Sequence, residues 1–211
     1  MKNTCSFFLA SLVSFFSLAQ ESTSVKFCGT SEAEKKFMSE HPELAPWVKQ
    51  EREDIERYTS EFSKNEITKQ AGTLYIIPVV FHILHENGPE NISDEQIRDA
   101  MRILNEDYRK RNADSALTVT AFKDIASDSE IEFRLAMKDP NGNSTNGIDR
   151  IYSSETNVGD ESSKLNPWPR NKYMNIWVVK NISSGAAGYT YLPGDWYSPS
   201  QDGIVVLHDY V

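Results

Sequence analysis

Histidine and cysteine are scarce in this sequence of 211 residues, which contains four His and two Cys. Two cysteines cannot build a disulfide framework or a Cys-rich zinc module. Basic residues are also outnumbered, with 22 Lys and Arg against 31 Asp and Glu, and the net charge is −9. Because phosphate contacts need a basic surface, an acidic chain is a poor match for nucleic acid. We therefore expect no nucleic-acid partner.

The N-terminus carries the one apolar stretch that resembles a targeting signal. Residues 1–19 contain the early cation Lys2, then a run rich in Phe, Leu and Ser, and end in Ser17-Leu18-Ala19. This arrangement is typical of a secretory signal peptide that is cleaved after Ala19. A membrane anchor is the alternative, but the run is short and interrupted by serines. We expect a secreted, extracellular protein with no membrane span after signal removal, since no later stretch has about 18 consecutive apolar residues.

Residues 20–72 are polar and show no strand pattern. Helices are predicted over 31–40 and 47–63. The apolar residues of the second helix fall on one face, and they are Val48, Ile55, Tyr58 and Phe62. A segment with so little apolar surface cannot bury a core of its own. It is therefore expected to lie against another part of the protein, with a boundary close to residue 72.

From residue 73 onward the pattern changes to buried strands. Residues 75–84 (YIIPVVFHIL) are almost continuously apolar, as expected of a strand buried on both faces. A helix is predicted over 93–112, with Ser93 as N-cap and Gln96 completing a capping box. Further strands are predicted over 131–137, 173–179, 188–192 and 203–210. This order predicts an α/β fold with a twisted five-stranded, mostly parallel sheet and a backing helix.

The sheet is predicted to lack part of its cover. A strand buried on both faces needs a layer on each side, and the helix over 93–112 supplies one. The sequence stops at Val211, directly after the last predicted strand. We therefore expect the first half of a domain. The alternative is that residues 20–72 supply the second layer and that the fold is complete.

The histidines match no recognised metal motif. The segment His82-Ile-Leu-His85-Glu86 fits neither HExxH nor HxxEH. Residues three apart in a strand point to opposite faces, so His82 and His85 cannot share a metal ion there. They are interpreted as a core histidine and a strand-end histidine. His208 is predicted to be a hydrogen-bonded core residue of the last strand. The alternative is a residue that holds the side chains of a nearby functional site in place.

Cys28 is the single cysteine that remains after signal removal, because Cys5 lies within residues 1–19. A lone free thiol in an exported chain stands out. One interpretation is an inert cysteine. The other is a thiolate that binds Zn²⁺ and fills the open fourth position of a catalytic site. The sequence leaves both open.

Several segments, in order, resemble the pappalysin family of metzincin zinc peptidases, particularly its bacterial secreted members. The matching segments are Cys28-Gly29-Thr30, 77–84, 92–112, 131–136, 139–142, 145–150, 171–179, 188–193 and 202–210. The match covers about residues 26–211. It implies a metzincin-like N-terminal subdomain whose sheet has an antiparallel edge strand. It also implies a signal peptide over 1–19, a propeptide over 20–72 and the N-terminal part of a catalytic domain over 73–211.

The resemblance implies a zymogen of a zinc metalloendopeptidase that hydrolyses proteins or peptides with a zinc-bound water. In such families the propeptide cysteine ligates the zinc, a role that falls on Cys28 if the zinc site exists. An extended substrate is expected to pair with the edge strand by strand addition. The residues assigned to substrate binding in this way are Gly185, Ala186, Ala187, Gly188 and Tyr189.

The catalytic motif of the family, HExxHxxGxxH, does not occur in the sequence. No catalytic residue is therefore assigned, and the chain of 211 residues is predicted to be inactive by itself. It is interpreted as the N-terminal portion of the peptidase. The alternative is a secreted, catalytically dead pseudo-peptidase that binds peptides or a protein partner through its edge strand.

Overall fold

The computed structural model describes residues 25–64 and 73–211. The predicted signal peptide over 1–19 lies outside these residues, and so does the chain immediately before the predicted boundary at residue 72. Within the described ranges, no helix is long and apolar enough to cross a bilayer.

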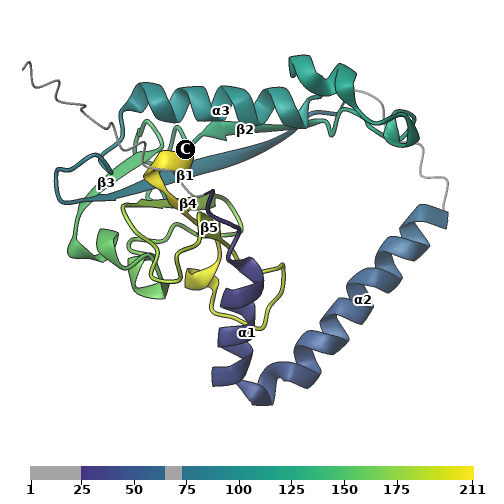
Figure 1. Cartoon of the computed structure of the whole chain (residues 1–211), viewed down its shortest axis with the longest axis horizontal. Coiled ribbons are helices and arrows are strands. Elements are labelled where there is room, and N and C mark those ends of the chain that lie inside the picture. The colour runs from purple at the N-terminus through teal and green to yellow at the C-terminus, as the bar shows by residue number, and fades with distance from the viewer. Residues whose placement is uncertain (1–24, 65–72) are drawn as a thin grey trace, which may run out of the picture.

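Three α-helices and six strands form the regular structure of these ranges (Figure 1). The helices are α1 (Thr30–Glu40), α2 (Ala45–Lys64) and α3 (Asp94–Tyr108). The strands are β1 (Tyr75–His85), β2 (Ile131–Leu135), β3 (Ile148–Tyr152), β4 (Met174–Val179), β5 (Gly188–Tyr189) and β6 (Ile204–Leu207). The 3-10 turns are Pro42–Leu44, Ala113–Leu117, Thr120–Phe122, Ser154–Asn157, Glu161–Ser163, Pro199–Gln201 and His208–Tyr210. Helices α1 and α2 agree closely with the helices predicted over 31–40 and 47–63.

The six strands form one sheet in the order β2-β1-β4-β6-β5, with β3 also paired to β1. The long strand β1 is central, since its first half pairs with β2 and its second half with β3 along one edge. Its other edge pairs with β4, and β4 pairs with β6. All of these pairings are parallel, whereas β5 is antiparallel to β6. The predicted α/β fold with a mostly parallel sheet and an antiparallel edge strand is confirmed.

The sheet has six strands rather than the predicted five, and the additional strand is β3. Its residues, Ile148 to Tyr152, are half-buried or exposed, so the sequence shows no continuous apolar run there. The last strand is also shorter than predicted. It ends at Leu207, and His208–Tyr210 form a 3-10 turn instead.

Pro78 lies inside β1, where a missing backbone N–H is tolerated for a geometric reason. The N–H of Tyr75 donates toward β2, to Glu130, so backbone nitrogens at even positions face the opposite edge. On that edge, pairing with β4 begins only at Val79. The nitrogen of Pro78 therefore needs no partner, and the strand accommodates the proline.

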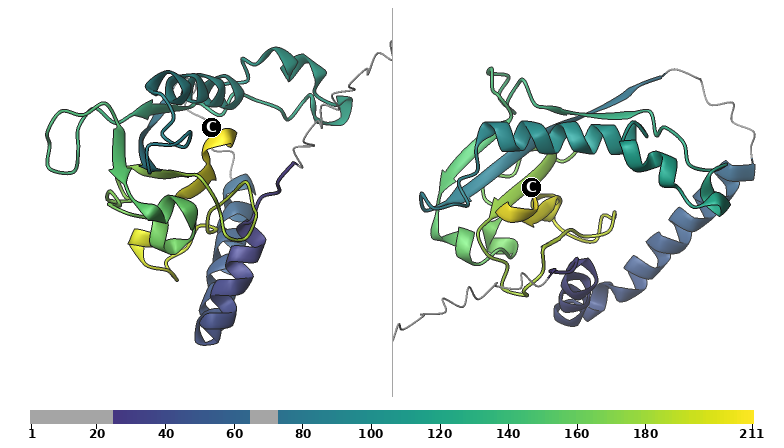
Figure 2. Two further views of the ribbon diagram at one scale, coloured as in Figure 1. Left: turned by 60° about the vertical axis from the view of Figure 1, so that its left-hand side comes forward. Right: turned by 45° about the horizontal axis from the view of Figure 1, so that its top comes forward.

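Helix α3 crosses one face of the sheet and packs its apolar side against β1 and β2 (Figure 2). The Ser93 hydroxyl caps the helix by accepting from the Gln96 N–H at 3.2 Å, as predicted. The Gln96 side chain does not complete the capping box. It donates instead to the carbonyl oxygens of His208 and Val211, and so ties α3 to the chain after β6.

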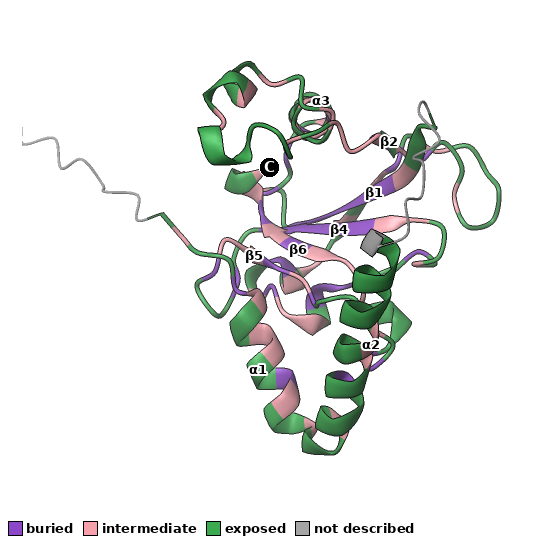
Figure 3. Ribbon diagram, turned by 90° about the vertical axis from the view of Figure 1, so that its right-hand side faces the viewer, coloured by how far each residue is buried: buried purple, intermediate pink, exposed green. Residues whose placement is uncertain are grey.

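Strand β6 is fully covered on one face and partly covered on the other. Val205 and Leu207 point away from α3 into a core around Trp177 and are 0% and 1% exposed. Ile204 and Val206 pack on the α3 side and are only partly buried. The ribbon of β6 carries both the buried and the intermediate colour in Figure 3. An apolar strip of the last strand thus remains open beside α3.

The two faces of β6 predict a contrast between two adjacent valines. Val205→Ala should lower the free energy of unfolding by about 2 kcal/mol, because it removes two fully buried methyl groups. Val206→Ala should cost less than about 1 kcal/mol, since its partners on the α3 side are incomplete. Urea unfolding of the two variants measures both values. Equal losses would show that the α3-side face of β6 is closed.

Helix α2 leaves most of its predicted apolar face uncovered. Val48 is buried against α1, whereas three residues farther along are exposed, namely Ile55, Tyr58 and Phe62. The sheet face opposite α3 is covered by loop residues that include Leu165 and Ile182. Helices α1 and α2 project from that side of the molecule (Figure 2).

Candidate functional site

The free edge of β5 is occupied by the chain's own N-terminal segment, residues 27–30. The Ala187 N–H donates to the Phe27 carbonyl oxygen at 2.8 Å, and the Gly29 N–H donates to the Gly188 carbonyl oxygen at 2.8 Å. Cys28 lies opposite Gly188 in a parallel bridge. The segment therefore extends the sheet by one short parallel strand, in the manner of strand addition.

Contacts at both ends hold this added strand in place. On one side the Lys26 N–H donates to the Tyr210 hydroxyl at 2.9 Å. On the other side the Thr190 N–H donates to the Thr30 hydroxyl at 3.2 Å. Helix α1 begins at Thr30, so the pairing ends where the helix starts.

Glycines allow the backbones to approach closely here. A Cβ on Gly29 would lie 2.7 Å from the Cβ of Ala186, and one on Gly188 would lie 2.8 Å from the Val205 carbonyl oxygen. Both distances are too short for real carbon contacts. The added strand and β5 therefore depend on glycine at both positions.

The five residues assigned to substrate binding play different parts. Ala187 and Gly188 use their backbone groups to pair with the added strand. The side chains of Ala186 and Tyr189 are buried on the inner side and do not face the edge. Gly185 adopts φ +76° at the turn before β5, with open space beside it. Backbone pairing at this edge thus rests on Ala187 and Gly188.

The Cys28 thiol is exposed, and its Sγ lies 3.3 Å from the Thr30 hydroxyl oxygen. Hydrogen bonds from the side chain and backbone of Thr30 lower the pKa of Cys28, against smaller opposing effects of burial and of the Glu32 charge. The thiolate is therefore favoured over that of an ordinary exposed cysteine.

Replacing Thr30 with valine should raise the pKa of Cys28, because the hydroxyl that stabilises the thiolate is removed. The pH midpoint of alkylation by iodoacetamide should move upward, so the rate at neutral pH falls. Thr30→Ser keeps the hydroxyl and serves as the control. An unchanged midpoint in Thr30→Val would show that Thr30 does not set the reactivity of the thiol.

The histidines do not assemble with Cys28. His82 is fully buried, with its ring nitrogens 3.1 Å from Asp149 Oδ2 and 3.0 Å from Asn175 Oδ1, as predicted for a core histidine. His85 lies at the end of β1, and its Nδ1 accepts the Asn87 N–H. The prediction for His208 was wrong. It lies after β6 rather than in it, and its buried Nδ1 has no hydrogen-bond partner among the described residues.

A zinc ion does not fit the described residues as they stand. Among them, no group of three or more His, Cys, Asp or Glu side chains is placed to hold a metal. Cys28 offers one sulfur donor at the sheet edge. The remaining ligands of a tetrahedral site would have to come from elsewhere.

Sequence reasoning missed an ion pair beneath β5. Lys164 is buried, with its Nζ 2.9 Å from Glu161 Oε1, and the Tyr189 hydroxyl donates to the same oxygen at 3.0 Å. Burial lowers the pKa of Lys164, while the Glu161 carboxylate opposes that shift. Both residues come from a polar stretch (ESSKLN) that is typical of an exposed loop, so no local signal indicated the burial of Lys164.

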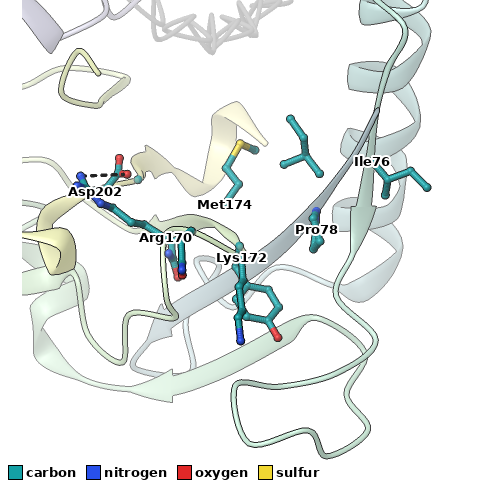
Figure 4. A pocket seen from close by; sticks show the side chains of 11 residues that line it. Ile76, Pro78, Arg170, Lys172, Met174 and Asp202 are labelled. Carbon is teal, nitrogen blue, oxygen red and sulfur yellow. Dashed lines mark ion pairs between the residues drawn. The ribbon is translucent and has the colours of Figure 1, made fainter. Parts of the chain in front are cut away.

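A hollow of about 360 Å³ lies at the start of β1 and β4. Figure 4 shows the side chains that line it. Its walls include Pro78, Met174 and Arg170. The Arg170 guanidinium is already paired, at 2.5 Å with Asp195 and at 3.8 Å with Asp202. The Arg170 guanidinium also donates to the Gly194 carbonyl oxygen, so Arg170 anchors the loop after β5.

Comparison with known proteins gives matches among solved structures. No protein-family model and no curated protein matches the chain. Mature mirolysin of Tannerella forsythia in complex with a cleaved peptide is 40% identical, with a TM-score of 0.59 over 64% of this chain and 53% of that chain. Mirolysin in complex with a compound is 39% identical, with a TM-score of 0.59 over 64% of this chain and 53% of that chain. A mutant of Tannerella forsythia promirolysin is 32% identical, with a TM-score of 0.66 over 87% of this chain and 60% of that chain.

These structures represent a metzincin-type metallopeptidase and its precursor. The mostly parallel sheet with its antiparallel edge strand matches the promirolysin fold. The similarity supports a metallopeptidase family for this chain. The chain spans 53% to 60% of the length of the structures it matches.

Proposed function

We propose that this chain is the N-terminal portion of a secreted zinc metalloendopeptidase of the pappalysin family, in its latent form. In this proposal residues 1–19 are a signal peptide, 20–72 a propeptide and 73–211 part of the catalytic domain. The observation that carries the proposal is the strand pairing of residues 27–29 with β5. The segment occupies the backbone groups that an extended peptide substrate would use.

The two kinds of matched structure support the propeptide assignment. The share of this chain that is covered rises from 64% with mature mirolysin to 87% with promirolysin. The difference of 23% corresponds to about 49 of the 211 residues. A propeptide over 20–72 has a closely similar length. Removal of that segment would free the edge of β5.

Cys28 is the residue we propose as zinc ligand of the latent state. It is exposed, its thiolate is favoured by Thr30, and it lies in the middle of the added strand. The substrate-binding residues we propose are Gly185 to Tyr189, with Ala187 and Gly188 as the pairing residues. The bound peptide in one mirolysin structure supports peptide or protein substrates for the intact enzyme.

The half-open face of β6 supports the view that a further element packs beside α3. Ile204 and Val206 lie there, only partly buried. The second candidate function is a secreted pseudo-peptidase that binds a peptide or a protein partner at the β5 edge, because that edge can pair without a metal. Both functions use the same backbone groups of β5.

The coding sequence beyond codon 211 distinguishes the two functions. An in-frame HExxHxxGxxH is expected for the peptidase, since that motif supplies three zinc ligands and the general base. A stop codon at this position in independent clones would favour the pseudo-peptidase. The purified chain of 211 residues should retain no stoichiometric zinc after dialysis and should cleave no casein. Zinc-dependent cleavage by this chain would contradict our interpretation of its histidines.

A further inference from the structure

Three aromatic side chains after β5 form a cluster that we call the aromatic cage. Its members are Tyr191, Trp196 and Tyr197. The ring centroid of Tyr191 lies 5.6 Å from that of Trp196 and 5.2 Å from that of Tyr197, and the last two rings are 4.7 Å apart. Such distances are typical of packed aromatic pairs. The cage lies where the chain leaves the edge strand.

Phe37 of α1 is seated in the cage. Its ring centroid is 5.5 Å from Tyr191 and 5.0 Å from Trp196, both in edge-to-face geometry. It is 8% exposed and is the one buried residue of α1. The rest of α1 is largely polar and solvent-facing. Phe37 is therefore the fully inserted side chain of α1, while Met38 of α1 and Val48 of α2 pack beside it against the same cluster.

Two cations contact rings of the cage and stabilise their positions. Lys164 Nζ lies 4.7 Å from the Tyr191 ring centroid, and the Arg170 guanidinium lies 5.7 Å from that of Tyr197. Each cation is fixed by a carboxylate, Glu161 for Lys164 and Asp195 for Arg170. These cation–π contacts do not involve Phe37. The positions of the Tyr191 and Tyr197 rings are therefore supported by contacts that do not depend on Phe37.

The cage is continuous with the pairing edge of β5. Tyr191 follows Tyr189 by two residues, and their rings are 6.3 Å apart. A cavity of about 460 Å³ runs along this side, and its walls include Gly29, Phe37, Tyr189 and Tyr191. A peptide paired with β5 would thus pass directly by the cage.

We propose that the aromatic cage is a substrate subsite that takes a bulky apolar side chain, preferably an aromatic one, of an extended peptide paired with β5. This inference rests on the proposed peptide-binding function of that edge. Phe37 fills the subsite in the latent form, while residues 27–29 fill the backbone positions. Strand addition supplies backbone affinity, and the cage supplies side-chain selectivity.

The test uses the ¹⁵N-labelled full chain carrying Gly29→Leu and Phe37→Ser, which displaces the added strand and empties the cage. The probes are acetylated heptapeptides of Ala, Ser and Thr in which one Phe moves from position to position, together with the parent without Phe. Amide signals of Gly188 and Tyr189 report strand pairing, and the indole N–H of Trp196 reports the cage. We expect Phe at one position to bind about tenfold more tightly than the parent and to shift the Trp196 signal.

Variants of two tryptophans provide the matched control. In the same background, Trp196→Ala should abolish the preference for Phe, whereas Trp47→Ala, at an exposed position of α2, should leave it intact. Equal affinity for all peptides, with Gly188 shifted and Trp196 unmoved, would overturn the subsite while strand pairing stands. Absence of any shift at Gly188 and Tyr189 would instead overturn the proposed peptide-binding edge.

A single variant keeps the inference testable if the double variant unfolds. In Phe37→Ser, Gly29 still holds the added strand on β5, and only the cage is emptied. Millimolar N-acetylphenylalaninamide should then shift the Trp196 indole signal, with no such shift in the wild type. N-acetylalaninamide is the control compound and should have no effect. The same response to both compounds would overturn the subsite.

Discussion

Replacing Asn175 with alanine is expected to lower the free energy of unfolding by about 3 kcal/mol or more, because three buried polar groups lose their partner. Asn175 is 2% exposed and lies in β4. Its Oδ1 accepts the Trp168 N–H at 2.9 Å and lies 3.0 Å from His82 Nε2. Its Nδ2 donates to the Trp168 carbonyl oxygen at 2.9 Å. Alanine would leave all three groups unpaired away from water.

Asn171→Ala is the matched control for this substitution. Asn171 is exposed and lies just before β4, so its removal should change the free energy of unfolding by less than about 0.5 kcal/mol. Urea unfolding at neutral pH measures both variants. A loss below about 1 kcal/mol in Asn175→Ala would show that water replaces the amide and that the loop around Trp168 is not held by it.

Replacing Gly29 with leucine is expected to release residues 27–30 from β5. The new Cβ would lie 2.7 Å from the Ala186 Cβ, and Ala186 is fully buried and cannot move aside. The amide of Ala187 would lose its acceptor, the Phe27 carbonyl oxygen. Its hydrogen exchange should accelerate by at least about tenfold, equivalent to about 1.4 kcal/mol in the free energy of local opening.

The same molecule contains an internal control for this experiment. The Leu207 amide donates to the carbonyl oxygen of Ala187, on the edge that faces β6. Hydrogen exchange of the Leu207 amide should therefore stay slow. Lys35→Leu, at an exposed position of α1, should leave both amides unchanged. Continued protection of Ala187 in Gly29→Leu would show that the added strand does not depend on glycine. That result would also weaken the proposed latent arrangement.

Local patterns determined those parts of the fold in which one stretch of chain carries its own signal. The almost continuous apolar run of β1 predicts a central strand, because a strand with both faces buried has apolar residues on both sides. The Ser93 cap predicts the start of α3 because the hydroxyl satisfies a backbone N–H three residues away. The spacing of His82 and His85 excludes a shared metal because side chains alternate along a strand.

The candidate site is different, because its parts meet only across long sequence separations. Cys28 pairs with Gly188 of β5, although the two residues lie far apart in the sequence. The contact between Phe37 and Trp196 likewise joins distant segments. The polar sequence around Lys164 is typical of a surface loop. Lys164 is nevertheless buried, because the rings of Tyr189 and Tyr191 pack against its Nζ. Strand β3 is short and half-exposed, so only its pairing with β1 identifies it.

The sequence by itself therefore determined the α/β class, the helices and the lack of a catalytic zinc motif, because each of these depends on residues within one segment. Only the tertiary structure decided that the chain's own N-terminal strand fills the edge of β5 and that Phe37 fills the aromatic cage. The physical reason is that backbone pairing and ring packing depend on distances in space, and no local periodicity records which distant segments will meet.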